Sequence, residues 1–475
     1  MPPPNFKVII VGTSMEGLTL AHCLYRAGLD YLLLEKQNGF SPRKDEVTII
    51  MPDGARILDQ LGLLDHMEEL LQPIEEAYLA YGNTEVYEVN FPEVLRERFG
   101  YTPSFVRKLK LVETLYNHLP RNDKVRFNKS VARIEGGTKC MRVMTWDGYW
   151  YEGDLVVGAD GVHSKVRAEM VRLSNLPELA MDINRDMTIE YARISGVSTH
   201  HPIRSTNTMI IHCRQGRTAI CLTEKDQRMS WSIYVKTQRR FAYGRAPEFS
   251  AKEAKQQCEG LLDDNILQNM SRSQGWEHRR TADMKPMELG LLRRWHWRRI
   301  LCIGNGMHKM APSTLKDVGC SIEDAAELTN FLHKFLQGRA EKPSMEEMDG
   351  VLTKYNERRL QRILPIFREA KQAMEYMTFS GLLNRVIAQY YLPKRGHLFA
   401  NWASKHVAGG AMLDFVPYPR RARLEWSDFR SEENTVLSIS RLITGVVILL
   451  LLILLGTNIL SGLDYTRWLR LIYRL

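Results

Sequence analysis

Residues 7–35 read KVIIV GTSMEG LTLAHCLYRAG LDYLLLE, and this stretch decides the fold. The apolar run at 7–11 predicts a buried strand, and the apolar residues at helical spacing after it predict a helix that ends at Gly28. Residues 31–34 predict a second strand. Strand, glycine turn, helix and strand in this order are typical of the parallel βαβ unit of an α/β protein.

The glycine turn has the form of a dinucleotide-binding turn. Gly12 allows the tight turn, Gly17 allows close helix packing, and Ser14 stands where a second glycine usually lets the backbone approach a pyrophosphate. Phosphates favour a helix N-terminus because its N–H groups are free and its dipole is positive. Glu35 ends the second strand, where a carboxylate can accept from both ribose hydroxyls. We therefore predict a nucleotide site at these four residues.

The rest of the chain alternates strands and helices. Residues 141–151 predict a hairpin about the Asp-Gly pair at 147–148. Further strands are predicted at 155–157, over much of 188–236, and at 300–303. Helices are predicted at 55–63, 106–119, 250–270, 321–336 and 345–377, the last with a bend at Pro365.

Two later segments add specific motifs. Residues 158–167 read GADGVHSKVR, and residues 304–312 read GNGMHKMAP, followed by SIEDAA at 321–326. Together with the glycine turn, they resemble the motifs of the group A FAD-dependent monooxygenases, whose fold is that of p-hydroxybenzoate hydroxylase. Residues 18–24, 55–62, 115–120 and 294–297 look like the membrane-bound fungal members that epoxidise prenyl chains in indole-diterpene and meroterpenoid pathways.

This resemblance extends from about residue 5 to the end of the chain and implies an organisation. The implied fold is α/β, a Rossmann-like FAD-binding domain with an inserted β-sheet substrate domain, C-terminal helices and a transmembrane helix. We expect the FAD-binding part at 1–180 and 291–340, the substrate domain at 181–290, the helical region at 341–414, a linker at 415–441, the transmembrane helix at 442–463 and a basic tail at 464–475.

The resemblance also implies cofactors and site residues. FAD would be the cofactor and NADPH its reductant. In the family, the GADG segment lies near the FAD pyrophosphate and the approach of the pyridine nucleotide. The resemblance assigns cofactor binding to Asp160, Gly304, Asn305, Val318 and, by spacing, either Arg107 or Lys108.

The flavin end departs from the family pattern. The family has an aspartate where this chain has Asn305, and a glycine-rich loop where this chain has STLKDV at 313–318. Leu315 and Asp317 add side chains where the family backbone approaches the flavin, and some of those positions need positive φ. Asp317 is alternatively an N-cap of the helix from 321. The small residues beneath the flavin are replaced by DEVT at 45–48.

These departures leave three functions open. The first is an FAD- and NADPH-dependent monooxygenase that epoxidises or hydroxylates a prenylated or terpenoid substrate. The second is a flavin-independent cyclase or isomerase that protonates an alkene or epoxide in the same cavity. The third is a non-catalytic scaffold for other pathway enzymes. Candidate acids and bases for the second function are Asp45, Glu46, His308, Lys316 and Asp317.

Residues 442–463 carry no charge and are long enough to span a bilayer. Arg467, Trp468 and Arg470 follow them, as at a membrane interface. The N-terminus lacks a signal-peptide pattern. We therefore expect a single-pass C-terminal anchor, with the catalytic body in the cytosol at an internal membrane such as the endoplasmic reticulum.

The composition excludes other classes. The net charge of the 475 residues is +10, but no nucleic-acid-binding motif accompanies the basic residues, so we expect no nucleic-acid partner. The seven cysteines are widely spaced and form no CxxC pair. This pattern predicts neither a disulfide framework nor a metal site.

Overall fold

The computed structural model describes residues 6–40, 46–82, 85–137, 140–198, 206–225, 228–258, 279–392, 396–423 and 426–429. The chain divides into two compact units, Met1–Arg430 and Ser431–Leu475, and all described residues belong to the first. Within these described ranges, no helix combines the length and apolarity needed to cross a bilayer. The predicted span at 442–463 and the candidate Asp45 lie outside the described residues.

The first sheet has six strands in the order β18-β19-β12-β1-β2-β8. β1 (Lys7–Val11) pairs in parallel with β2 (Asp30–Leu34) and with β12 (Leu155–Gly158). β19 (Ile300–Cys302) and β8 (Val125–Arg126) extend the parallel part, and β18 (His296–Trp297) is an antiparallel edge. The predicted strands at 7–11, 31–34, 155–157 and 300–303 are confirmed, because buried parallel strands are apolar on both faces.

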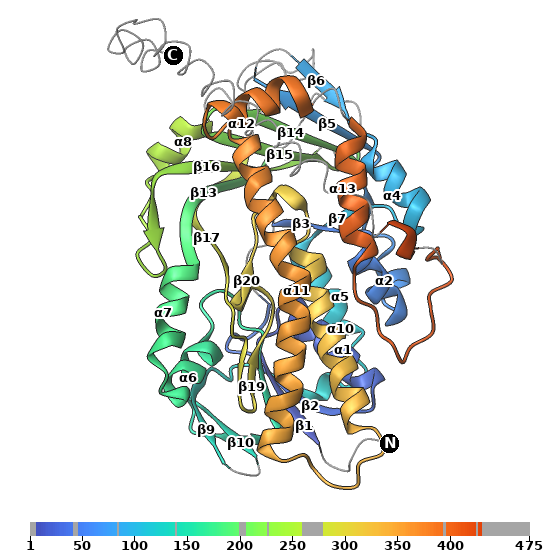
Figure 1. Ribbon diagram of the computed structural model, residues 1–475, viewed down its shortest axis with the longest axis vertical. Helices are drawn as coiled ribbons and strands as arrows, with labels where there is room; N and C mark the ends of the chain where they lie inside the picture. The colour runs from blue at the N-terminus through green and yellow to red at the C-terminus, as the bar shows by residue number, and fades with distance from the viewer. Residues whose placement is uncertain are drawn as a thin grey trace, which may run out of the picture. The chain divides into compact units, whose positions relative to one another are not determined.

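Helices cover this sheet (Figure 1). α1 (Met15–Arg26) connects β1 to β2 and packs against α10 (Asp317–Leu336). α11 (Met345–Met377) packs on α10, and it contacts β18 of the first sheet and β14 (Thr208–Arg214) of the second. It begins at a capping box of Ser344 and Glu347 and continues through Pro365.

The second sheet has eight strands in the order β20-β17-β13-β16-β15-β14-β5-β6. β13 (Met187–Ser198) lies between β16 (Met229–Ala242) and β17 (Arg279–Leu291), antiparallel to both. α8 (Ala251–Cys258) contributes Ala254 and Cys258 to an apolar cluster with Trp231. The remaining strands are β5 (Glu76–Tyr81), β6 (Glu85–Glu88), β15 (Arg217–Thr223) and β20 (His308–Lys309). β5, β6 and β20 therefore join this sheet from outside residues 181–290.

Two three-stranded sheets complete the strands. β10 (Met141–Thr145) pairs with β9 (Val131–Gly136) and with β11 (Trp150–Gly153), and Gly148 in the hairpin turn has φ +84°. The predicted hairpin is confirmed. In the other sheet, β7 (Ser104–Arg107) lies between β3 (Val47–Ile50) and β4 (Gln72–Pro73).

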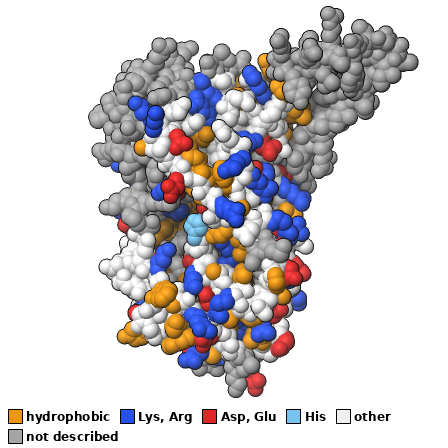
Figure 2. Space-filling model, turned by 90° about the vertical axis from the view of Figure 1, so that its left-hand side faces the viewer, with side chains coloured by type: hydrophobic (Ala, Val, Ile, Leu, Met, Phe, Trp, Pro, Cys, Tyr) orange, Lys and Arg blue, Asp and Glu red, His pale blue; other side chains and the backbone are white. Residues whose placement is uncertain are grey.

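The other helices are α2 (Pro52–Gln60), α3 (Leu64–Met67), α4 (Phe91–Phe99), α5 (Lys108–Asn117), α6 (Lys165–Ser174), α7 (Pro177–Asp186), α12 (Leu382–Val386), the π-helical turn η4 (Ile387–Tyr391) and α13 (Gly396–Ala408). The helix predicted at 106–119 begins later, because its first residues are the end of β7. On the face shown in Figure 2, Lys and Arg side chains are interspersed with apolar and acidic ones.

Candidate functional site

A cavity of about 410 Å³ lies between the nucleotide turn and the eight-stranded sheet. On the side of the first sheet, the cavity wall is formed by Met15, Asn305, Leu315 and Val318. On the side of the second sheet, the wall is formed by Ile220, Leu222, Trp231 and Tyr234. The cavity thus joins the predicted cofactor region to the predicted substrate domain, and it has an apolar wall.

The nucleotide turn is packed so tightly that two of its residues must be glycine. A Cβ on Gly12, whose φ is +108°, would lie 2.5 Å from the carbonyl oxygen of Ala159. A Cβ on Gly17 would lie 2.2 Å from the carbonyl oxygen of Gly12. Ser14 caps α1, and its Oγ accepts from the Gly17 N–H at 3.3 Å. The turn therefore places the backbone N–H groups at the N-terminus of α1 where they can bind an anion such as a phosphate.

Glu35 follows β2 directly and is fixed beside this turn. Its Oε2 accepts from the N–H of Thr13 at 2.8 Å and from the Thr13 hydroxyl at 2.7 Å. Its Oε1 accepts from the N–H of Gln37 at 2.9 Å. The carboxylate thus stands next to the turn, at the position expected of a ribose ligand.

Asp160 follows β12, across β1 from Glu35. Its Oδ2 accepts from the N–H groups of Lys165 at 2.7 Å and Val166 at 3.1 Å. Its Oδ1 is buried and has no protein partner. Burial is the main influence on this carboxyl and raises its pKa.

The segment at 304–309 is held from behind by α10. Gly304, with φ +63°, donates its N–H to Asp324 Oδ2 at 2.8 Å. His308 contacts the same oxygen through Nε2 at 2.6 Å and is fully buried. The side chain of Asn305 lies in the cavity wall, where its Oδ1 is buried without a partner. His308 therefore positions the segment and does not line the cavity.

The loop before α10 carries the departures noted in the sequence. Leu315 has φ +57°, a conformation that favours glycine, and its side chain lines the cavity. Lys316 is the N-cap residue and Asp317 the first residue of α10, so Asp317 is not the N-cap. The Lys316 ammonium pairs with Asp53, both side chains being 0% exposed, and it does not line the cavity.

Asp317 does line the cavity. Its Oδ2 lies 3.0 Å from Nζ of Lys309, and its Oδ1 is buried without a partner. Burial, the largest influence on Lys309, lowers its pKa, but Asp317 more than offsets it and the net pKa is raised. The two side chains form an ion pair at the cavity wall.

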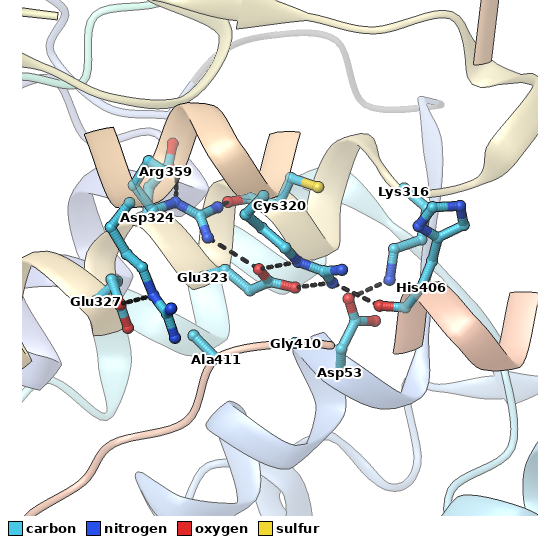
Figure 3. A network of polar contacts seen from close by, with 12 residues as sticks. Asp53, Lys316, Cys320, Glu323, Asp324, Glu327, Arg359, His406, Gly410 and Ala411 are labelled. Carbon is cyan, nitrogen blue, oxygen red and sulfur yellow. Dashed lines mark hydrogen bonds and ion pairs between the residues drawn. The ribbon is translucent and has the colours of Figure 1, made fainter. Parts of the chain in front are cut away.

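α10 is anchored to α11 by buried ion pairs (Figure 3). Glu323 lies 3.0 Å from both Arg359 and Arg362, and Asp324 lies 2.7 Å from Nε of Arg359. Burial alone raises the pKa of Glu323, but the two guanidinium groups outweigh it and hold this pKa well below its usual range. Both helices are thereby fixed behind the loop.

Glu46 lines the cavity beside two cations. Its Oε1 lies 2.9 Å from Arg193, and its Oε2 lies 3.8 Å from Lys108. Lys108 lines the cavity, whereas Arg107 pairs with Glu224 at 2.5 Å. Of the two positions proposed for the family arginine, the structure therefore brings Lys108 to the cavity.

The sequence analysis did not select several charged and aromatic residues of the cavity, among them Glu16, Arg193, Trp231 and Lys309. Arg193 and Trp231 come from separate strands and carry no local signal, whereas Lys309 lies inside the motif at 304–312. Glu16 lies within the glycine turn, in the first turn of α1. An acidic residue there ordinarily stabilises the helix through its dipole, so the sequence alone does not mark Glu16 as a site residue. Its side chain is only 3% exposed.

The described residues fit the nucleotide half of FAD. The turn at Gly12 and Gly17 leaves no room for side chains, and Glu35 stands beside it. Asn305 offers an unpaired buried oxygen to a hydroxyl donor such as the ribityl chain. At the end of the cavity where the sequence analysis places the flavin, Leu315 and Asp317 both line the wall.

Comparisons with known proteins identify the family of this chain. The model of the FAD binding domain family matches residues 5–370. The FAD-dependent monooxygenase spyC of Aspergillus fumigatus is 37% identical over 445 residues, covering 92% of this chain and 93% of its own. The FAD-dependent monooxygenase cdmI of Talaromyces verruculosus is 35% identical over 454 residues, covering 94% and 95%.

Solved structures show the same fold. Klebsiella pneumoniae HpxO, complexed with FAD and uric acid, superposes with a TM-score of 0.67 at 17% identity and covers 85% of this chain and 97% of its own. The p-nitrophenol 4-monooxygenase PnpA of Pseudomonas putida has a TM-score of 0.64 at 18% identity, covering 84% and 95%.

Proposed function

The chain belongs to the FAD binding domain family and is an FAD-dependent monooxygenase, and on this premise we propose that it oxygenates a prenylated or terpenoid intermediate of fungal secondary metabolism. The reaction is an epoxidation or a hydroxylation. One observation carries the proposal: a single cavity is bordered by the nucleotide turn on one side and by the apolar wall of Ile220, Leu222 and Trp231 on the other.

The roles of the residues follow from their places. The nucleotide half of FAD would be held by Gly12, Ser14, Gly17 and Glu35, and the ribityl chain by Asn305, whose Oδ1 is buried without a partner. Bound FAD, reduced by NADPH, supplies the redox chemistry that lets O2 transfer one oxygen atom. The apolar wall excludes water and positions the alkene.

The membrane is the proposed location. Two features support it: the uncharged residues 442–463, and an exposed apolar stripe on α12 and η4. Leu382, Val386 and Tyr390 recur at every fourth position, so they share one helix face, and each is more than half exposed. An apolar substrate that partitions into the bilayer would reach such an enzyme at the membrane surface.

The decisive experiment uses the full chain purified in detergent. We expect FAD in the protein and, with NADPH and a prenylated aromatic acceptor, a product heavier by one oxygen atom that derives from isotopically labelled O2. The same assay repeated with a panel of prenylated and terpenoid acceptors identifies which of them is the substrate. A protein that binds FAD yet incorporates no labelled oxygen into any acceptor would contradict the proposed reaction.

A second function is favoured by the charged groups of the same cavity. Glu46 and Asp317 face it together with the cations Arg193 and Lys309. Either carboxyl group, in its protonated form, could donate a proton to an alkene or epoxide and take one back from the resulting cation, without FAD. An isomer of unchanged mass, formed without NADPH and O2, would identify this cyclase or isomerase activity.

A further inference from the structure

Glu16 is an acidic residue placed inside the cofactor-binding turn. It is the last residue before Gly17 and lies in the first turn of α1, whose N-terminus the turn exposes. Its side chain is 3% exposed and contributes to the cavity wall. The carboxyl is therefore buried at the place where the backbone is arranged to receive an anion.

The Glu16 carboxyl reaches across to the opposite segment. A Cβ on Gly304 would lie 2.6 Å from Glu16 Oε1 and 2.9 Å from its carboxyl carbon. Gly304 begins the 3-10 turn η2 (Gly304–Gly306), and its neighbour Asn305 lines the same cavity. The carboxyl thus occupies the gap between the N-terminus of α1 and η2.

Glu35 stands on one side of the glycine turn, and Leu315 and Val318 line the cavity on the other side. An FAD with its ribose at Glu35 and its flavin in the cavity would carry its pyrophosphate past the N-terminus of α1, through this gap. An ionised Glu16 would meet the phosphates as a like charge in a poorly solvated place, whereas a protonated Glu16 could donate a hydrogen bond to a phosphate oxygen.

The surroundings of Glu16 favour the protonated form. Burial is the largest influence and raises its pKa, while a hydrogen bond to its own backbone, Lys108 and Ser14 lower it, and Asp317 raises it. Lys108 comes from α5, Ser14 from the turn itself and Asp317 from α10. The net pKa is raised above the ordinary value.

We propose that Glu16 controls the binding of FAD in this chain: the cofactor binds when Glu16 is protonated and is repelled when Glu16 is ionised. This inference rests on the proposed function in that FAD is the cofactor. FAD affinity then falls as pH rises, by up to about tenfold per pH unit for a single proton. Replacement of the carboxyl by a neutral group removes that dependence.

The test is a titration of the full-length, detergent-purified apoprotein with FAD between about pH 5.5 and about pH 8.5, a range that brackets neutrality. Quenching of flavin fluorescence gives the affinity. The variants are Glu16→Gln, which keeps the shape, and Glu16→Ala, which opens the gap. Glu93→Gln is the matched control, because it makes the same change in an exposed side chain of α4 that pairs with Arg96 outside the cavity.

The expected result is tighter FAD binding by both Glu16 variants at the alkaline end of this range, with no pH dependence, while Glu93→Gln follows the wild type. Melting curves at each pH report whether each variant is folded. Three results would overturn the proposal: Glu16→Gln binding like the wild type at every pH, Glu93→Gln giving the same gain, or no binding by a folded Glu16 variant. Failure of oxygen insertion in a protein that binds FAD would instead count against the proposed function alone.

Discussion

At the scale of single residues, the site depends on where a few carboxylates are fixed. Glu35 is held at the end of β2 by the backbone and hydroxyl of Thr13. Its spacing from Gly12 was sufficient to predict its position beside the glycine turn, because the length of a βαβ unit sets where the second strand ends. The position of Glu16 against Gly304 was not predictable in this way, because η2 lies almost 290 residues further along the chain.

Glu35→Gln should weaken FAD binding by about 0.5–2 kcal/mol, roughly two- to thirtyfold, since a charged acceptor of hydrogen bonds becomes a neutral one. Flavin fluorescence titration of the purified protein measures this loss. Glu113→Gln is the control, because Glu113 pairs with Lys110 on the exposed side of α5. An unchanged affinity in Glu35→Gln would place the ribose elsewhere.

The stability of the wild type should also depend on the charge of Glu16. Burial raises the pKa of Glu16 in the folded protein, so the folded state retains a proton that the unfolded chain has lost. The free energy of unfolding therefore falls as pH rises from about 4.3, the unfolded value, through the folded pKa, and then levels off. Urea denaturation of wild type and Glu16→Gln across this pH range should show the free energy of unfolding of the variant rising relative to that of the wild type as the pH rises. A constant difference would contradict the raised pKa.

At the scale of elements, the strands and helices of the first sheet were predictable, and the start of α10 was not. Local apolar runs define β1, β2, β12 and β19. The helix expected from Ser321 begins at Asp317, because a tertiary ion pair between Lys316 and Asp53 holds the N-cap residue and Leu315 takes a left-handed conformation before it. No local pattern encodes a partner that is 263 residues away.

Lys316→Met should destabilise the protein by about 3–5 kcal/mol, because it leaves the carboxylate of Asp53 buried without its cation. The double variant Asp53→Leu with Lys316→Met should recover most of this loss, since two apolar side chains can fill the space of a buried pair. Chemical denaturation of the three proteins measures both effects. If the double variant were as unstable as the sum of the single ones, the pair would not be the origin of the cost.

At the scale of the whole molecule, the two large sheets meet at one cavity, and residues from both border it. The sequence predicted the order of the parts through a resemblance, but not the exchange of strands between them. β5 pairs with β14, β6 pairs with β5, and β20 pairs with β17. The edge of a sheet can be covered by any segment that lies next to it in space, so the order of the chain does not predict these pairs.

Attachment to the membrane is tested on the intact chain. We expect the full protein to stay with membranes after a carbonate wash. Replacement of Leu450 and Leu454 by arginine should release it, because a charged side chain at the centre of a bilayer costs about 2.5–3.5 kcal/mol on insertion scales. Arginine at Leu442 and Leu463, the ends of the same segment, is the milder control. Release of the unaltered protein would argue against an anchor.

The wide separation of paired strands has a consequence for synthesis. β1 emerges first from the ribosome, but β19, which completes the parallel sheet beyond β12, follows almost 300 residues later. Until then the apolar edge of β12 has no strand to pair with, and such distant pairings form slowly. Between residues 158 and 300 of its elongation, the nascent chain therefore carries an unsatisfied sheet edge, a state prone to aggregation. Slower translation at low temperature and co-produced chaperones should raise the yield of soluble or membrane-inserted protein.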